Sequence, residues 1–129
     1  MQAPPVVIRR RDEHRIQDEI IKYLRNLEWL VKTMHGNAFQ SGVPDLFASH
    51  ARWGQRWIEV KNPLLFSFTQ AQKIDFPQFM SHGSPIWVMS AATDEEYKKL
   101  FKPGNLMEYI QCAYDGCTNI EAWRGGRRK

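Results

Sequence analysis

The sequence predicts an α/β protein in which helices flank a mixed central β-sheet, in the order helix, three strands, helix, strand, helix. Three observations support this fold class. Apolar residues recur at helical spacing across residues 12–28, and short strand-like runs follow at 29–34, 44–49 and 55–61. A capped helix then begins near residue 69 and leads to an apolar run at 85–90.

The first helix contains an acid in an unexpected place. Its apolar face is formed by Ile16, Ile20, Tyr23, Leu24 and Leu27. Glu13 lies one turn before Ile16 and projects from this face, where a carboxylate suits a metal site better than a core. Alternatively, Asp12 and Glu13 complement the positive end of the helix dipole. Glu19 is a second candidate acid, but it lies off the centre of the face.

The runs at 44–49 and 55–61 predict a hairpin, because the turn residues Ala51 to Gly54 separate them. This register places Asp45 across from Glu59 and Lys61, which share one face of their strand. Two carboxylates beside an ammonium group can hold Mg²⁺ and orient a water against a phosphodiester. A structural explanation is also open: turn chemistry after Pro44 for Asp45, and an ion pair for Glu59 with Lys61.

Later segments predict the remaining elements. The Thr69-x-x-Gln72 pattern is typical of a capping box, and Pro77 should kink or end that helix near Phe76. The run 85–90 predicts a central, buried strand. A second capping pattern at 93–96 begins a helix through residue 100 or 101, and residues 106–113 predict another.

Length and composition indicate one domain of an ordinary soluble protein, with 129 residues, 43% hydrophobic and 25% charged. No apolar run approaches the roughly 18 residues of a membrane span, and the first residues do not resemble a secretory signal. We therefore expect a cytoplasmic protein of a phage or bacterial cell, or a nuclear one, that is neither secreted nor in a membrane. Cys112 and Cys117 lack two further ligands for zinc and predict reduced thiols.

The net charge of +4 is concentrated at the two ends of the chain. Seven of the eighteen basic residues lie in segments without any acid: Arg9, Arg10, Arg11, Arg124, Arg127, Arg128 and Lys129. Eleven basic residues therefore face fourteen acidic ones in between. We predict a basic arm at 1–11, a single domain at 12–123 and a basic tail at 124–129. Such arms suit a phosphate backbone, although the tail could also be merely solvated.

The paired carboxylates carry a family resemblance. Pro44-Asp45 with Glu59-Val60-Lys61 resembles the core of PD-(D/E)xK nucleases. The wider motifs 42–46 and 57–61, with Glu13-x-x-Ile16-Gln17, resemble the VRR-NUC branch in its small stand-alone form. The resemblance runs from about residue 12 to residue 90. It implies a restriction-endonuclease-like core and makes residues 12–123 a nuclease domain.

The resemblance also implies chemistry: hydrolysis of DNA that depends on Mg²⁺ or Mn²⁺. Asp45, Glu59 and the Val60 carbonyl would bind the metal, and Glu13 would join them directly or through water. Lys61 would either stabilise charge on the phosphate or activate a water.

The helix that follows Lys61 supplies one more candidate. A glutamine at this point in the family contacts the site or the DNA backbone, and Gln72 matches that position better than Gln70. The capping role explains Gln72 equally well.

No base-reading motif is present in the sequence, so recognition through the phosphate backbone and shape is expected. The DNA-binding candidates are Arg9, Arg10, Arg11, Arg127, Arg128 and Lys129. The resemblance implies branched substrates such as four-way junctions, and a homodimer with two sites would cut them symmetrically. The alternatives are a non-catalytic DNA-binding module with the same fold, and a nuclease for RNA or linear DNA.

Overall fold

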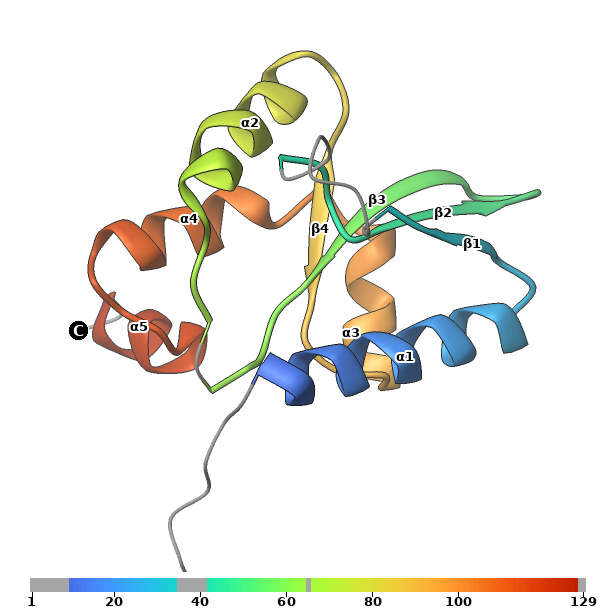
Figure 1. The fold of residues 1–129 in the computed structure, drawn as a ribbon, viewed down its shortest axis with the longest axis horizontal. Helices are drawn as coiled ribbons and strands as arrows, with labels where there is room; N and C mark the ends of the chain where they lie inside the picture. The colour runs from blue at the N-terminus through green and yellow to red at the C-terminus, as the bar shows by residue number, and fades with distance from the viewer. Residues whose placement is uncertain (1–9, 35–41, 65, 128–129) are drawn as a thin grey trace, which may run out of the picture.

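The computed structural model describes residues 10–34, 42–64 and 66–127, and it contains a mixed, four-stranded sheet (Figure 1). The strands lie in the order β1-β2-β3-β4, with β1, β2 and β3 antiparallel and β4 parallel to β3. The elements in chain order are α1 (Arg10–Asn26), β1 (Leu30–Thr33), β2 (Leu46–His50), β3 (Gly54–Val60), α2 (Gln70–Ser81), β4 (Ile86–Met89), α3 (Asp94–Lys98) with a 3-10 turn (Lys99–Phe101), α4 (Leu106–Tyr114) and α5 (Ile120–Arg127). The predicted α/β class and element order are confirmed, with one additional helix at the end.

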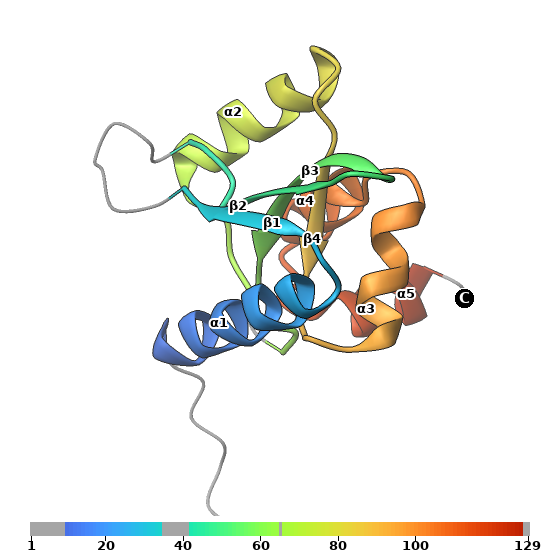
Figure 2. The same ribbon diagram turned by 90° about the vertical axis from the view of Figure 1, so that its right-hand side faces the viewer.

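The sheet separates two apolar cores. One core joins β-strand residues such as Ile58 and Val60 to Ile20 and Leu24 of α1. The other core lies on the opposite face and includes Phe76 of α2 together with residues of β4, α4 and α5. Figure 2 shows α1 and α2 on opposite sides of the strands. Alternate residues of β3 therefore face different helices.

The predicted hairpin forms in the expected register. Leu46 lies opposite Ile58, and His50 lies opposite Gly54. Gly54 adopts a positive φ of 86°, which a side chain would oppose, so a glycine suits the end of this turn. Asp45 directly precedes β2 and therefore lies beside Glu59. Local alternation and turn chemistry are enough to bring these two carboxylates together.

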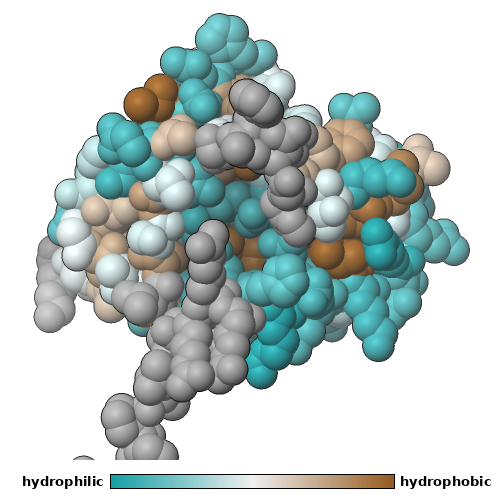
Figure 3. All heavy atoms as spheres, viewed as in Figure 1, coloured by the Kyte–Doolittle hydropathy of each residue, from teal (hydrophilic) through white to brown (hydrophobic). Residues whose placement is uncertain are grey.

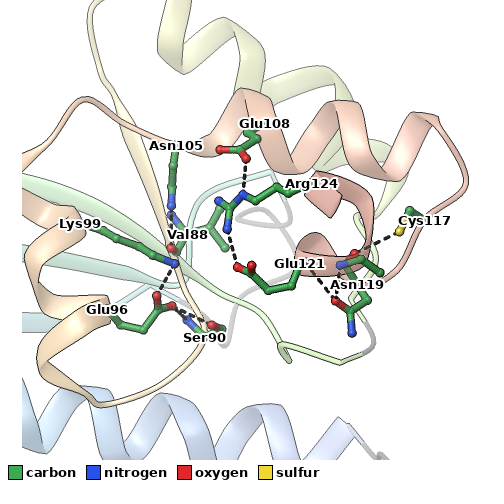
Figure 4. Close-up of polar contacts among 11 residues, drawn as sticks. Val88, Ser90, Glu96, Lys99, Asn105, Glu108, Cys117, Asn119, Glu121 and Arg124 are labelled. Atoms are coloured by element: carbon green, nitrogen blue, oxygen red, sulfur yellow. Dashed lines mark hydrogen bonds and ion pairs between the residues drawn. The ribbon is translucent and has the colours of Figure 1, made fainter. Parts of the chain in front are cut away.

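The strand at 86–89 is buried as predicted, but its predicted central position is wrong. In the described part of the chain, β4 lies at the edge of the sheet, and all four of its residues are buried. The Asn105 side chain explains how the outer edge is satisfied. Its amide accepts a hydrogen bond from Val88 N at 2.6 Å and donates one to Val88 O at 3.1 Å (Figure 4).

Helix α2 begins at the predicted cap but does not end at Phe76. Thr69 and Gln72 form the complete capping box. The helix then continues through Pro77 to Ser81. Buried Phe76 and the packing of Phe79 against Trp57 of β3 hold the helix on both sides of the proline. Tertiary contacts thus outweigh the loss of one backbone hydrogen bond.

The C-terminal end also differs from the predicted tail. Helix α5 runs from Ile120 to Arg127 and crosses the boundary that we placed at residue 124. Arg124 contacts Glu108 of α4 and donates to Glu121 at 2.6 Å (Figure 4). Ile120 is buried in the second core. No helix within the described residues has the length and apolar character needed to cross a membrane.

Candidate active site

Backbone N–H groups of the facing segment hold the carboxylates of Asp45 and Glu59. The Asp45 N–H donates to Glu59 Oε1 at 3.1 Å, and the Val60 N–H donates to Asp45 Oδ2 at 2.9 Å. These reciprocal contacts follow from the hairpin register, because each carboxylate lies next to an amide of the opposite strand. The two side chains are therefore fixed before any ligand binds, which favours precise chemistry.

Lys61 completes the group that the sequence predicted. Its Nζ lies 3.0 Å from Glu59 Oε2 and donates to Gln72 Oε1 at 3.2 Å. The ammonium group also lies 4.5 Å from the centre of the Phe68 ring, a cation–π distance. Lys61 is only 4% exposed, so these contacts replace almost all of its hydration.

Gln72 combines the two roles that the sequence left open. As the N3 residue of α2, it accepts at Oε1 from Thr69 N at 3.0 Å, which completes the cap. The same oxygen receives the Lys61 hydrogen bond, and Nε2 donates to Glu59 Oε2 at 2.9 Å. Gln70 is exposed. Of the two glutamines, Gln72 is thus the one that contacts Glu59 and Lys61.

The carboxylate pair is electrostatically strained. Glu59 is fully buried, and this desolvation together with the neighbouring Asp45 carboxylate raises the Glu59 pKa to about 8. Lys61 acts in the opposite direction but does not compensate. Without a metal, Glu59 therefore keeps a proton at neutral pH. A divalent cation between the carboxylates would replace that proton, so the donor set fits a hard metal ion.

The described residues offer few ligands beyond this pair. They contain no group of three or more His, Cys, Asp or Glu side chains that could hold a metal ion. Mg²⁺ needs only one or two protein carboxylates, because waters and substrate phosphates fill its other positions. Asp45 and Glu59, with the Val60 carbonyl, are sufficient for such a site.

Glu13 reaches the same end of β3 from another helix. Its Oε2 accepts from the backbone N–H of Asn62 at 3.4 Å, and Asn62 directly follows Lys61. The α1 acid is therefore next to the site strand, although it forms no three-carboxylate metal group with Asp45 and Glu59. Its part in metal binding stays a prediction. Glu19 is exposed on α1.

Two buried polar residues in this area, Gln17 and Asn62, were not among the site residues predicted from the sequence. Gln17 lies one turn after Glu13 and is 6% exposed, and Asn62 is also 6% exposed. The Asn62 side chain accepts from Leu64 N at 2.9 Å and turns the chain after β3. A polar residue at an apolar-face position of a helix is the signal that marks Gln17.

Three of the six basic residues proposed for DNA contact lie outside the residues that the structure describes. Arg9, Arg128 and Lys129 lie outside the described residues, whereas Arg10 and Arg11 begin α1 and Arg127 ends α5. Their contacts with DNA stay predictions. The molecular face in Figure 3 is hollowed near its centre, between α1 and α2, and the hollow is lined mainly by hydrophilic side chains.

A mixed sheet with an antiparallel hairpin, a parallel fourth strand and helices on both faces defines an α/β protein with a restriction-endonuclease-like core. A solved structure described as a VRR_NUC domain is similar to this chain, with a TM-score of 0.57 and 22% sequence identity. The similarity covers 70% of this chain and 95% of that domain. It confirms the predicted resemblance at the level of the fold. No protein-family model and no curated protein sequence matches the chain.

Proposed function

We propose that this protein is a metal-dependent DNA endonuclease that hydrolyses phosphodiester bonds. The observation that carries the proposal is the group of Asp45 with the buried residues Glu59, Lys61 and Gln72, joined by hydrogen bonds of 2.9–3.2 Å. Burying this much charge and polarity costs stability, and such groups cluster at functional sites. The VRR_NUC-like fold supports a nuclease task.

Asp45 and Glu59 would hold the cation, with the Val60 carbonyl as a further ligand and Glu13 acting through a water. Mg²⁺ or Mn²⁺ would polarise the scissile phosphate and lower the pKa of a bound water. The fixed positions of both carboxylates restrict where the cation binds. The hydrogen bond from Val60 N fixes the position of one Asp45 carboxylate oxygen.

Lys61 is best suited to stabilise charge on the phosphate. It already contacts two oxygen atoms, from Glu59 and Gln72, which hold its Nζ beside the carboxylate pair. An ammonium at this point neutralises charge that develops in the transition state. Gln72 keeps the ammonium in place from the first turn of α2.

The substrate is proposed to be DNA, recognised through its backbone by the basic ends of the chain. Branched DNA such as a four-way junction, cut by a homodimer with two sites, is the form that we favour. We also place the protein in a DNA-containing compartment, the cytoplasm or the nucleus. Sedimentation with and without junction DNA tests the dimer; a monomer in both cases would contradict it.

The first experiment compares a labelled four-way junction with its linear duplex in Mg²⁺, Mn²⁺ or EDTA. Wild type is compared with Asp45→Asn and Lys61→Ala, and with Asp18→Asn as a control on the exposed face of α1. We expect cutting that needs metal, Asp45 and Lys61 but not Asp18. Asp45→Asn should still bind DNA.

The other outcomes separate the alternatives. Equal cutting of junction and duplex would retain the nuclease and remove the junction preference. Cutting of RNA would change the substrate class. Binding of DNA without cutting in either metal would favour a non-catalytic module. Wild-type turnover by Asp45→Asn would refute the site.

A further inference from the structure

We propose that Asp75 of α2 is a positioning residue for the metal-binding Asp45, and that it acts through contact with Gly42. This inference rests on the proposed function of the site. Asp75 makes no contact with the reacting atoms in this account. It sets the place of the turn from which Asp45 projects.

The closest observation is the space around Gly42, three residues before Asp45. A Cβ atom at position 42 would overlap Oδ2 of Asp75 and lie 2.8 Å from Cγ and 3.1 Å from Cβ of that residue. Gly42 does not have a left-handed φ, so its backbone conformation is open to any residue. The Asp75 side chain is therefore what restricts position 42 to glycine.

Asp75 lies on the site-facing side of α2. It follows Gln72 by three residues, so the two side chains lie on one face of the helix. Gln72 donates to Glu59 on β3. Phe79, one turn further, packs against Trp57 of the same strand with ring centres 5.7 Å apart.

One rigid helix thus contacts both halves of the carboxylate pair. Gln72 fixes the Glu59 side chain, and Asp75 fixes the turn that leads to Asp45. Neither half can move relative to the other without moving α2. A displacement of about 1 Å at a reacting group costs on the order of 100-fold in rate. The separation of the two carboxylates is therefore sensitive to this contact.

A simple packing contact would behave differently. It would change the free energy of unfolding but leave the metal affinity and kcat of the folded protein unchanged. A positioning role predicts that a variant that disturbs the contact stays folded but loses metal affinity and kcat, with little change in its KM for DNA. Restoring the space at the contact should then restore both quantities.

The test uses the full chain as wild type, Gly42→Ala, Asp75→Ala and the double variant. Gly125→Ala is the control, because Gly125 has open space around it and an ordinary φ. Mn²⁺ affinity is measured by calorimetry and cleavage by kcat and KM. We expect Gly42→Ala to lose about 100-fold in kcat. Adding Asp75→Ala should recover at least tenfold, because only the approach to Cβ remains tight.

Asp75→Asn provides the conservative comparison, because it keeps the size of the side chain. Its kcat should remain within about threefold of wild type, which a role through shape requires. Wild-type kcat and metal affinity in Gly42→Ala would overturn the inference. So would a double variant no better than Gly42→Ala, or a 100-fold loss in Asp75→Asn.

Failure of the proposed function would be recognised separately. In that case wild type would neither bind Mn²⁺ nor cut DNA. Thermal denaturation of the same variants would still report on the contact, since residues that touch give non-additive changes in stability. Additive effects of Gly42→Ala and Asp75→Ala would overturn the positioning role independently of any activity.

Discussion

The two faces of β3 are buried to the same extent by opposite kinds of side chain. Ile58 and Val60 are fully buried against the first core, while Glu59 and Lys61 on the other face are 0% and 4% exposed. Burial of each apolar side chain contributes roughly 1.5–3 kcal/mol to stability. Burial of a charge costs stability unless every partner is in place.

This difference shows which residues stabilise the strand and which residues depend on its stability. Residues on the apolar face stabilise the strand, and the polar face depends on that stability. Gln72 Nε2, Asp45 N and Lys61 Nζ supply the polar contacts that make burial of Glu59 tolerable. Variants on the two faces should therefore separate activity from stability.

The largest effect is expected from Glu59→Gln on the polar face. Cleavage should fall by at least ~10³-fold, about 4 kcal/mol in activation free energy, because a metal-binding carboxylate is lost. Stability at pH 7 should change little, since the buried carboxyl is already protonated in the metal-free protein. Turnover and chemical denaturation measure the two quantities. Glu95→Gln, an exposed glutamate of α3, serves as the control. Undiminished cleavage by Glu59→Gln would contradict the assignment.

The pH dependence of the free energy of unfolding should also report on the polar face of β3, through Glu59. Burial raises the pKa of Glu59 to about 8 in the folded state, whereas a free glutamate carboxyl has a pKa of 4.5. Between these values the folded state binds more protons than the unfolded state, so the free energy of unfolding falls as pH rises. The fall is complete above about pH 8. Denaturation in EDTA measures it, and Glu59→Gln should flatten it. An equal slope in both proteins would assign the proton elsewhere.

Ile58→Ala tests the apolar face. The free energy of unfolding should fall by about 3 kcal/mol, because a cavity remains in the first core. Cleavage per folded molecule should be retained within a few-fold. Ile74→Ala, at an exposed position of α2, should change stability by about 0.5 kcal/mol or less. A loss of activity larger than the loss of stability would show that the two faces of β3 are not separable.

The smallest effect concerns the basic residues at the C-terminal end of the chain. In this variant, serine replaces Arg127, Arg128 and Lys129. The slope of log DNA affinity against log salt concentration should become shallower by about 0.9 for each phosphate contact that is lost. Arg124 is left unchanged because it contacts Glu108 and Glu121 within the fold. Filter binding across salt concentrations gives the slope. An unchanged slope would mean that these three residues make no contact with DNA phosphates.

The hairpin and its carboxylate pair could be predicted from the sequence because the signals are local. Alternation along the strand and a Gly-containing turn are sufficient to fix the register that brings Asp45 to Glu59. The capping pattern likewise located the start of α2, and it selected Gln72. Neither signal indicates that the residue also contacts Lys61, since that contact depends on how α2 packs.

The errors have non-local causes. An apolar run does not reveal whether a strand is central or at an edge, and β4 is buried at an edge because Asn105 and helices cover it. The run of basic residues without an acid placed the start of a tail at residue 124, yet α5 runs to Arg127 and Arg124 contacts Glu108 of α4. Asp75 and Gly42 are far apart in the sequence, and no local sequence pattern around either residue indicates that they approach each other.

The side chains at the two sheet edges have a consequence for solubility. Asn105 satisfies both main-chain groups of Val88 on β4, and Arg25 donates to Val31 O on β1 at 3.0 Å. Open strand edges recruit strands from other chains and so begin aggregation. The Asn105 amide and the Arg25 guanidinium therefore hinder the pairing of a further strand with these edges. The two strands at the ends of the sheet order are thus each protected by a side chain at the edge where aggregation would begin.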